Sequence, residues 1–313
     1  MNEPKCHVCG DDSLETLFEV FEDQRLVRCN ACRIVAIEPF KDVNYDEDFS
    51  GATAKSLKIP GFITRHIGTD GRSPSSDHRN LTQLNEIEKV RKALNSGAVS
   101  ASGQVDFLDY GCGDGDFMLS AKESGYGAWG VEISQAKIAA CQAQQLTVLH
   151  TDKREELPKE FQVIRLSHVL EHVQDPRELL EFCRDRMATC ALLVIEVPNF
   201  SSPLSTMRRG GWRFIRKDHL YYFTPDTLTT MLQSVGLTVL KGRVTGSLGL
   251  TQILNERIAP WSGAFIRHHP WTIPAKKVYS GLMSTLRLGD FVRVFATLTF
   301  TGVRPRYGSK NSD

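Results

Sequence analysis

The sequence lacks a long apolar run. Its longest apolar stretches, such as ALLVIEV at residues 191–197, are far shorter than the roughly 20 residues that a membrane-spanning helix needs. The polar start MNEPKCHVCG has no apolar core of a secretory signal peptide, and the chain has no internal repeat or low-complexity tract. These absences predict a folded cytoplasmic protein with one large domain and a small appendage.

Net charge is also small, at +1 over 313 residues, but it is unevenly distributed. Residues 1–50 hold 5 Lys/Arg and 12 Asp/Glu, a net −7, whereas residues 201–313 hold 16 Lys/Arg and 5 Asp/Glu, a net +11. We therefore expect an anionic partner to meet the last third of the chain.

Cysteine occurs eight times, and half of these residues form two CxxC pairs, Cys6 with Cys9 and Cys29 with Cys32. This spacing is typical of a structural zinc site with four thiolate ligands. The segments LETLFEVFE and QRLVRC between the pairs predict a hairpin too small to fold without metal. We predict a zinc ribbon over residues 1–42, with two disulfides or a redox pair as the alternative. Its negative charge disfavours binding to a nucleic-acid backbone.

Residues 43–104 predict a lid followed by a helical linker. Residues 43–80 are polar and rich in Gly, Ser and Thr, which predicts an irregular or mobile segment. In LTQLNEIEKVRKAL, Leu81, Leu84 and Ile87 have helical spacing.

From residue 105 the pattern alternates between strands and helices, which predicts an α/β fold with a parallel sheet. Two late strands, LTVLKGRV and DFVRVFATLTF, are separated by an insertion of about forty residues. The predicted core spans residues 105–246 with an acceptor-side segment at 200–225, followed by a helical insertion or cover at 247–288 and a last strand with a tail at 289–313.

The stretch FLDYGCGDGDF, residues 107–117, places glycines between a predicted strand and a predicted helix. Bare backbone at a helix N-terminus is the geometry of nucleotide binding. A dinucleotide is disfavoured, because the GxGxxG pattern would put Asp116 where a third small residue is needed.

These residues resemble motif I of class I S-adenosylmethionine (SAM) dependent methyltransferases. Glu132 ends the next strand twenty-one residues after Gly111, where a carboxylate can accept hydrogen bonds from both ribose hydroxyls. Asp152 ends the third strand, where the family's acidic residue meets the adenine amino group. The resemblance implies a Rossmann-like fold with SAM as cofactor. The predicted cofactor site comprises Asp109, Gly111, Cys112, Gly113, Gly115, Glu132, Ile133, Asp152, Lys153, Ser167 and His168.

The fourth strand, in FQVIRLSHVLEHVQDP, also matches the family pattern, except that Gln162 stands where Asp is usual. The resemblance implies that the backbone at Ser167 and His168 lies near the methionine end of SAM. HVLEH also spells the HxxEH signature of inverted zinc proteases, but it follows a strand directly instead of lying within a long helix, so that function is disfavoured.

Methyl transfer mainly requires alignment of the acceptor behind the methyl group and, for a hydroxyl or acidic carbon, removal of a proton. His172 is the first candidate for the general base and His219, in HLYYFTP, is the second. His172 could instead form a hydrogen bond with neighbouring loop backbone. Four aromatic residues are expected to line the acceptor pocket or to belong to the ordinary core: Trp212, Tyr221, Tyr222 and Phe223.

A basic cluster gives the best indication of the acceptor. It comprises Arg208, Arg209, Arg213, Arg216 and Lys217, and it suits a phosphate-bearing small molecule through charge-assisted hydrogen bonds. A solvated basic face is the alternative. Residues 264–288 are expected to cover the cleft or form a homodimer contact, and peripheral membrane contact is less favoured.

The four-cysteine ribbon, the SAM core and the segments EVPNF and HLYYFTP together resemble zinc-ribbon methyltransferases, which include sugar C-methyltransferases of deoxysugar pathways. The predicted function is methyl transfer to a small, polar, anionic acceptor such as a nucleotide-linked sugar. An RNA methyltransferase and a non-catalytic SAM-binding scaffold remain alternatives.

Overall fold

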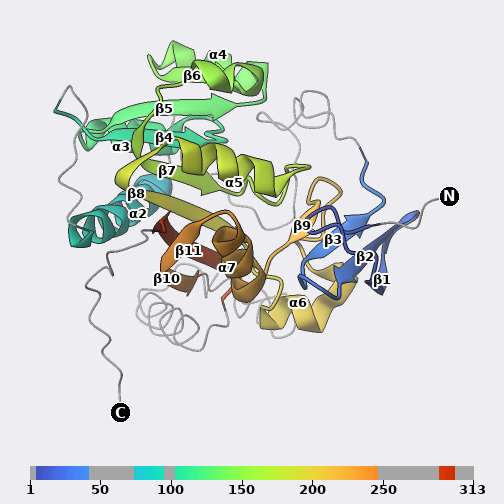
Figure 1. Cartoon of the computed structure of the whole chain (residues 1–313). Helices are drawn as coiled ribbons and strands as arrows, with labels where there is room; N and C mark the ends of the chain where they lie inside the picture. Colours follow the sequence, from blue (N-terminus) through green and yellow to red (C-terminus); the bar gives the residue numbers. More distant parts are fainter. Residues whose placement is uncertain (1–4, 42–73, 95–102, 246–288, 300–313) are drawn as a thin grey trace, which may run out of the picture.

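The computed structural model describes residues 5–41, 74–94, 103–245 and 289–299. A large α/β core stands beside a smaller sheet formed largely by the N-terminal ribbon (Figure 1). Residues 43–73 of the predicted lid segment, the predicted insertion at 247–288 and the tail beyond residue 299 lie outside the described residues.

The core is a seven-stranded sheet in the order β10-β11-β8-β7-β4-β5-β6. The pairs from β8 to β6 are parallel, and β11 and β10 add an antiparallel edge. This confirms the predicted Rossmann-like sheet. The strands are β4 (Asp106–Tyr110), β5 (Gly127–Glu132), β6 (Thr147–His150), β7 (Phe161–Ser167), β8 (Met187–Pro198), β10 (Leu237–Thr245) and β11 (Phe291–Leu298).

Helices cover both faces of this sheet (Figure 1). Along β4, Phe107 belongs to the apolar cluster under α2, whereas its neighbour Leu108 belongs to the cluster that contains α5 and α7. This alternation is what a strand buried on both faces requires. The helices are α2 (Pro74–Ala93), α3 (Asp116–Glu123), α4 (Gln135–Ala143), η1 (Thr151–Glu156), α5 (Pro176–Asp185), α6 (Pro203–Arg208), η2 (Arg209–Gly211) and α7 (Pro225–Ser234).

Helix α2 differs from the prediction in its start and in its role. It begins at Pro74, so the expectation of an irregular chain up to residue 80 was wrong for residues 74–80. Proline is well suited to the first turn of a helix, where its missing N–H has no partner to lose. Leu84, Ile87 and Val90 are buried against the sheet. The helix is therefore a layer of the core.

The ribbon confirms the predicted hairpin, in which β1 (Leu14–Phe21) pairs antiparallel with β2 (Gln24–Cys29). β2 continues into β3 (Val35–Glu38), and β3 pairs with β9 (Tyr221–Tyr222), a strand of the acceptor-side segment. Leu26 and Ile37 of the ribbon share one buried cluster with Tyr221. The ribbon is thus joined to the segment that carries His219.

Candidate functional site

A cavity of about 1060 Å³ opens at the carboxyl ends of β4, β5 and β7. The strand order reverses between β4 and β7, and crevices at such points are where open α/β sheets bind ligands. The loop after β4, the end of β5 and the turn after β7 all contribute to its wall. Gly111, Gly113, Glu132, Ile133, His168, His172 and His219 line it.

The three glycines of the loop have different roles. Gly111 has φ +74°, and a Cβ there would lie 2.4 Å from Cγ2 of Val169. Gly113 has φ +57°, and a Cβ there would meet nothing within 4 Å, which leaves room for a ligand. Gly115 is the N-cap of α3, and a Cβ there would lie 2.6 Å from Leu146, so Gly115 serves helix packing and does not line the cavity.

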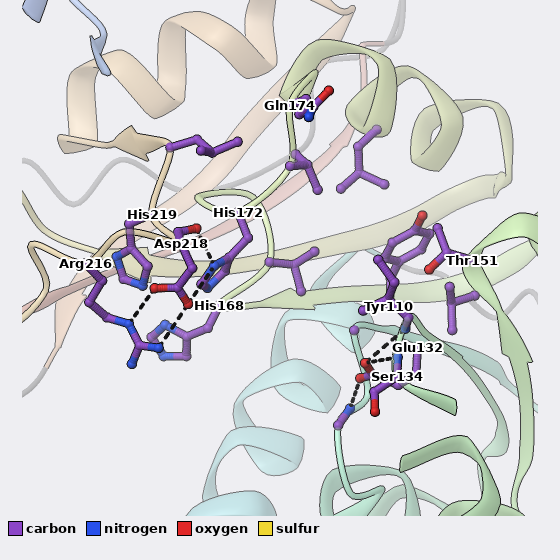
Figure 2. Close-up of a pocket in the computed structure, with 18 of the residues that line it drawn as sticks. Tyr110, Glu132, Ser134, Thr151, His168, His172, Gln174, Arg216, Asp218 and His219 are labelled. Carbon is purple, nitrogen blue, oxygen red and sulfur yellow. Dashed lines mark hydrogen bonds and ion pairs between the residues drawn. The ribbon is translucent and has the colours of Figure 1, made fainter. Parts of the chain in front are cut away.

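Glu132 is buried at the end of β5, and its carboxylate ties the loop together (Figure 2). Oε2 accepts a hydrogen bond from the Gly113 N–H at 2.8 Å. Oε1 accepts from the N–H groups of Ile133 at 2.9 Å and Ser134 at 3.1 Å. A carboxylate has about four acceptor positions. One position on Oε2 therefore remains, and recognition of both ribose hydroxyls would displace a loop hydrogen bond.

Asp109 does not face the cavity, which differs from its predicted role in the cofactor site. The neighbouring Tyr110 lines the cavity, whereas Asp109 alternates to the opposite face of β4. There it pairs with Arg165 at 2.8 Å, and burial raises the pKa of its carboxyl. Asp109 is a buried structural partner of Arg165.

Asp152 lies two residues beyond β6, not at the end of that strand as expected. It is within η1, its side chain is 86% exposed, and its carboxylate is 3.3 Å from Nδ1 of His150. The cavity lining instead includes Thr151 and Arg154. A contact of Asp152 with adenine stays a prediction. The other predicted cofactor residues that do not line the cavity are Cys112, Lys153 and Ser167.

The two candidate histidines meet on the other side of the cavity. The rings of His172 and His219 are perpendicular, with centroids 4.6 Å apart. Nδ1 of His172 lies 2.8 Å from the Asp218 carbonyl oxygen, so the ring donates a hydrogen bond there. Burial, followed by the nearby His172, lowers the pKa of His219 to about 4. The imidazole of His219 is therefore neutral near pH 7.

Asp218, which the sequence argument did not place at the site, and Arg216, a member of the predicted basic cluster, frame the histidines (Figure 2). Arg216 donates two hydrogen bonds to the Asp218 carboxylate, at 2.8 and 2.9 Å. Burial alone would raise the pKa of Asp218, but these bonds hold it below its usual value. The sequence feature that could have identified Asp218 is its position directly before His219, a candidate site residue.

Glu171 fixes the two histidine segments relative to each other. Its backbone carbonyl accepts hydrogen bonds from the N–H groups of Leu220 at 2.7 Å and Tyr221 at 3.2 Å. Its side chain is 1% exposed, and Oε1 lies 3.2 Å from Nδ1 of His168. The turn after β7 is thereby held to the chain that follows His219.

Only part of the predicted basic cluster reaches the cavity. Arg213 and Arg216 line it, whereas Arg208, Arg209 and Lys217 do not. The Arg213 guanidinium lies 4.3 Å from the ring centroid of Phe214, and burial lowers its pKa. Lys41, from the end of the ribbon, is a further cation in the lining that the sequence argument missed.

The predicted acceptor-pocket aromatics belong to the core. Trp212, Tyr221, Tyr222 and Phe223 are at most 2% exposed, and none of them lines the cavity. Phe214 and Phe291 line it instead. Phe291 comes from β11. This strand lies far along the chain from the motifs of the core, so the motifs could not identify Phe291.

The four ribbon cysteines form a compact cluster. Their sulfur atoms all lie within 4.8 Å of one another, and Sγ of Cys6 is 3.6 Å from Cys32 while Sγ of Cys9 is 3.5 Å from Cys29. Tetrahedral zinc with bonds near 2.3 Å would hold thiolates roughly 3.8 Å apart. The cluster therefore fits that ion.

The parallel sheet, the glycine loop and the carboxylate at the end of β5 define this chain as a class I SAM-dependent methyltransferase. A family model described as a methyltransferase domain matches residues 77–241, more than half of the chain. The chain belongs to this methyltransferase domain family.

Curated relatives and solved structures are similar to it at low identity. Two ubiquinone biosynthesis O-methyltransferases from strains of Pseudomonas fluorescens are 25% and 28% identical over 172 residues, which is 50% of this chain and 74% of each relative. A SAM-dependent methyltransferase structure from Archaeoglobus fulgidus has a TM-score of 0.44 and 24% identity, covering 67% of this chain and 93% of that one. Within the described segments, no helix is long and apolar enough to cross a membrane.

Proposed function

We propose that this methyltransferase transfers the methyl group of SAM to a small, polar, anionic acceptor such as a nucleotide-linked sugar. One observation carries the proposal: a single cavity has the glycine loop and Glu132 on one side, and the histidine pair with Arg213 on the other. A cofactor and an acceptor can therefore lie in one cavity. The assignments of cytoplasmic location and of a homodimer stay predictions.

The cofactor half of the cavity fits an adenosyl group. Gly113 leaves open space beside its Cα, and Glu132 keeps an acceptor position for a ribose hydroxyl. Ile133 is an exposed apolar side chain in the lining, suited to packing on a flat ring. SAM supplies an electrophilic methyl group on a sulfonium. The proposed role of these residues is to hold it and to exclude water.

The acceptor half is assigned to His172 and His219. For a hydroxyl or an acidic carbon, the acceptor must lose a proton during transfer. The proposed role of the pair is to bind and activate the reacting atom. That His172 itself takes the proton stays a prediction. The names of the relatives, which are O-methyltransferases, favour oxygen as the accepting atom.

Arg213 supports an anionic acceptor. Among the described residues its guanidinium contacts the ring of Phe214 and makes no ion pair with a carboxylate within 4.0 Å. Arg216, by contrast, is already neutralised by Asp218. A guanidinium can bind phosphate oxygens through two parallel hydrogen bonds. Arg213 is therefore the proposed phosphate contact.

We also propose that the four cysteines bind structural zinc. Their compact arrangement supports this, and so does the small size of the hairpin, which cannot bury a core of its own. All four ligands are protein thiolates, which is typical of a structural and not a catalytic zinc site.

The decisive test measures transfer of a labelled methyl group from SAM to paired acceptors, each a nucleotide-linked sugar and its neutral sugar. We expect label on the phosphate-bearing member only. Arg213→Gln should raise the KM at least about tenfold, because charge-assisted hydrogen bonds contribute about 1.5 to 3 kcal/mol. Arg208→Gln, outside the cavity lining, is the matched control. Equal transfer to neutral sugars would contradict the anionic acceptor.

A further inference from the structure

We infer that Glu171, His172 and His219 form a binding site for a divalent transition-metal ion on the acceptor side of the cavity. Each of the three offers one ligand atom, and these atoms all lie within 4.8 Å of one another. Ligand atoms about 2.1 Å from a tetrahedral ion are roughly 3.4 Å apart. A pair at the 4.8 Å limit would therefore have to close by about 1.4 Å as the ion binds.

Two of the three side chains hold buried polar atoms without a hydrogen-bond partner. Glu171 is 1% exposed and its Oε2 has no partner, and His219 is 5% exposed and its Nδ1 has none. A buried polar atom without a partner is unfavourable by about 1 to 3 kcal/mol, and more for a charged group. Both orphaned atoms belong to residues of the same cluster. One cation would satisfy both.

The surrounding contacts are those that usually support metal ligands. His172 donates its Nδ1–H to the Asp218 carbonyl at 2.8 Å, so its other ring nitrogen, Nε2, is the proposed ligand atom. Oε1 of Glu171 lies 3.2 Å from Nδ1 of His168. Ligating histidines and carboxylates are commonly oriented by such outer hydrogen bonds.

The ligand set selects the class of metal. Two imidazoles and one carboxylate suit Zn²⁺, Mn²⁺, Fe²⁺ or Co²⁺, whereas Mg²⁺ and Ca²⁺ prefer oxygen ligands. The site also differs from the ribbon, because it has three protein ligands and His172 and His219 line the cavity. Positions left open toward a cavity are the mark of a catalytic metal site.

This inference rests on the proposed function and makes it more specific. A cation here would bind the acceptor hydroxyl oxygen and lower its pKa, so that the proton leaves to water instead of to His172. The oxygen then forms its bond to the methyl carbon as the carbon–sulfur bond breaks and the sulfonium becomes a neutral thioether. The acceptor class is accordingly an alcohol or phenol.

The test uses the full-length protein loaded with about one equivalent of zinc, so that the ribbon thiolates are occupied and the proposed site is left for Mn²⁺. Mn²⁺ is titrated in and the unbound ion is followed by electron paramagnetic resonance. We expect one bound Mn²⁺ per chain, with nitrogen couplings from imidazole in pulsed spectra. Glu171→Gln and His219→Asn should each raise the Mn²⁺ dissociation constant more than about tenfold, the lower limit reported for loss of an outer partner alone.

Glu181→Gln is the matched control, because this partly exposed glutamate of α5 pairs with Arg177 and lies outside the cluster. It should leave Mn²⁺ binding unchanged. Calorimetric binding of S-adenosylhomocysteine to each variant shows that the fold and the cofactor half persist. Absence of Mn²⁺ binding in the wild type, or equal binding by Glu171→Gln, overturns the metal site. If the wild type does not bind S-adenosylhomocysteine, the proposed function itself is contradicted.

Discussion

The Glu132 carboxylate accepts hydrogen bonds from three backbone N–H groups, which belong to the two segments that flank the cofactor half of the cavity. The residue chosen for a ribose contact therefore also holds the glycine loop against the end of β5. Its replacement should affect SAM in two ways, through a lost ligand contact and through a less ordered loop.

Glu132→Ala should weaken SAM binding by about 1 to 3 kcal/mol, the range for leaving a buried hydrogen-bonding group without its partner, or roughly 5- to 150-fold in Kd. The SAM affinity of Glu132→Gln should lie between those of Glu132→Ala and the wild type, because the amide carbonyl oxygen still accepts a hydrogen bond. Isothermal calorimetry with S-adenosylhomocysteine measures both. Glu156→Gln, an exposed residue of η1, is the control. Unchanged affinity in Glu132→Ala would refute the assignment.

At the residue scale, the sequence located those side chains whose position follows from the end of a strand. Gly111, Glu132, His168 and His172 all come directly after or within a few residues of a parallel strand, and all line the cavity. Asp109, one residue before the cavity-lining Tyr110, faces the other side of the sheet, because successive side chains of a strand alternate between its faces. The role of Asp218 depends on a contact with His172, 46 residues away along the chain.

At the scale of elements, α2 was predicted as a helix but not as part of the core. The apolar spacing of Leu84, Ile87 and Val90 was visible, but their burial depends on partners such as Phe107 and Leu192. Asn80 also reaches the carbonyl of Asp116 at the start of α3, at 3.2 Å. Helix existence follows from local pattern, whereas its docking depends on distant strands.

Ile87→Ala should therefore lower the free energy of unfolding by about 2 to 5 kcal/mol, as expected for truncation of a fully buried side chain. Ile87 is 0% exposed and faces the sheet. Leu81→Ala is the control on the same helix, since Leu81 is 47% exposed and should change stability by no more than about 0.5 kcal/mol. Urea unfolding measures both. Equal losses of stability in the two variants would show that α2 does not pack against the sheet.

The β3–β9 pairing makes the ribbon a support for the acceptor side. Cys29→Ser, which removes one of the four thiolates, should reduce zinc below the wild-type value of about one per chain. Amide hydrogen exchange should then accelerate in β9, whose strand partner is β3. Exchange in β4 and β5 should stay as in the wild type, because no ribbon strand pairs with them. Unaltered protection in β9 would contradict this coupling.

At the scale of the molecule, the sequence predicted a ribbon and a sheet but not that the two pack together. Local patterns identify each hairpin and each strand, whereas the β3–β9 bridge joins residues almost 190 positions apart. The buried cluster that contains Leu26 and Ile37 also contains Tyr221 and Leu193 of β8. The ribbon is thus part of the main core, where an appendage was expected.

A shared core has a thermodynamic consequence. If Leu26 and Ile37 lose their places when the ribbon unfolds, Tyr221 and its neighbours lose their packing at the same time. We therefore expect a single calorimetric transition for the zinc-loaded protein, and a single transition at a lower Tm after chelation, because bound metal stabilises the folded state by mass action. S-adenosylhomocysteine should raise the Tm in both forms, since its half of the cavity contains no ribbon cysteine. Two separate transitions, with only the first sensitive to chelator, would show that the ribbon folds independently of the sheet.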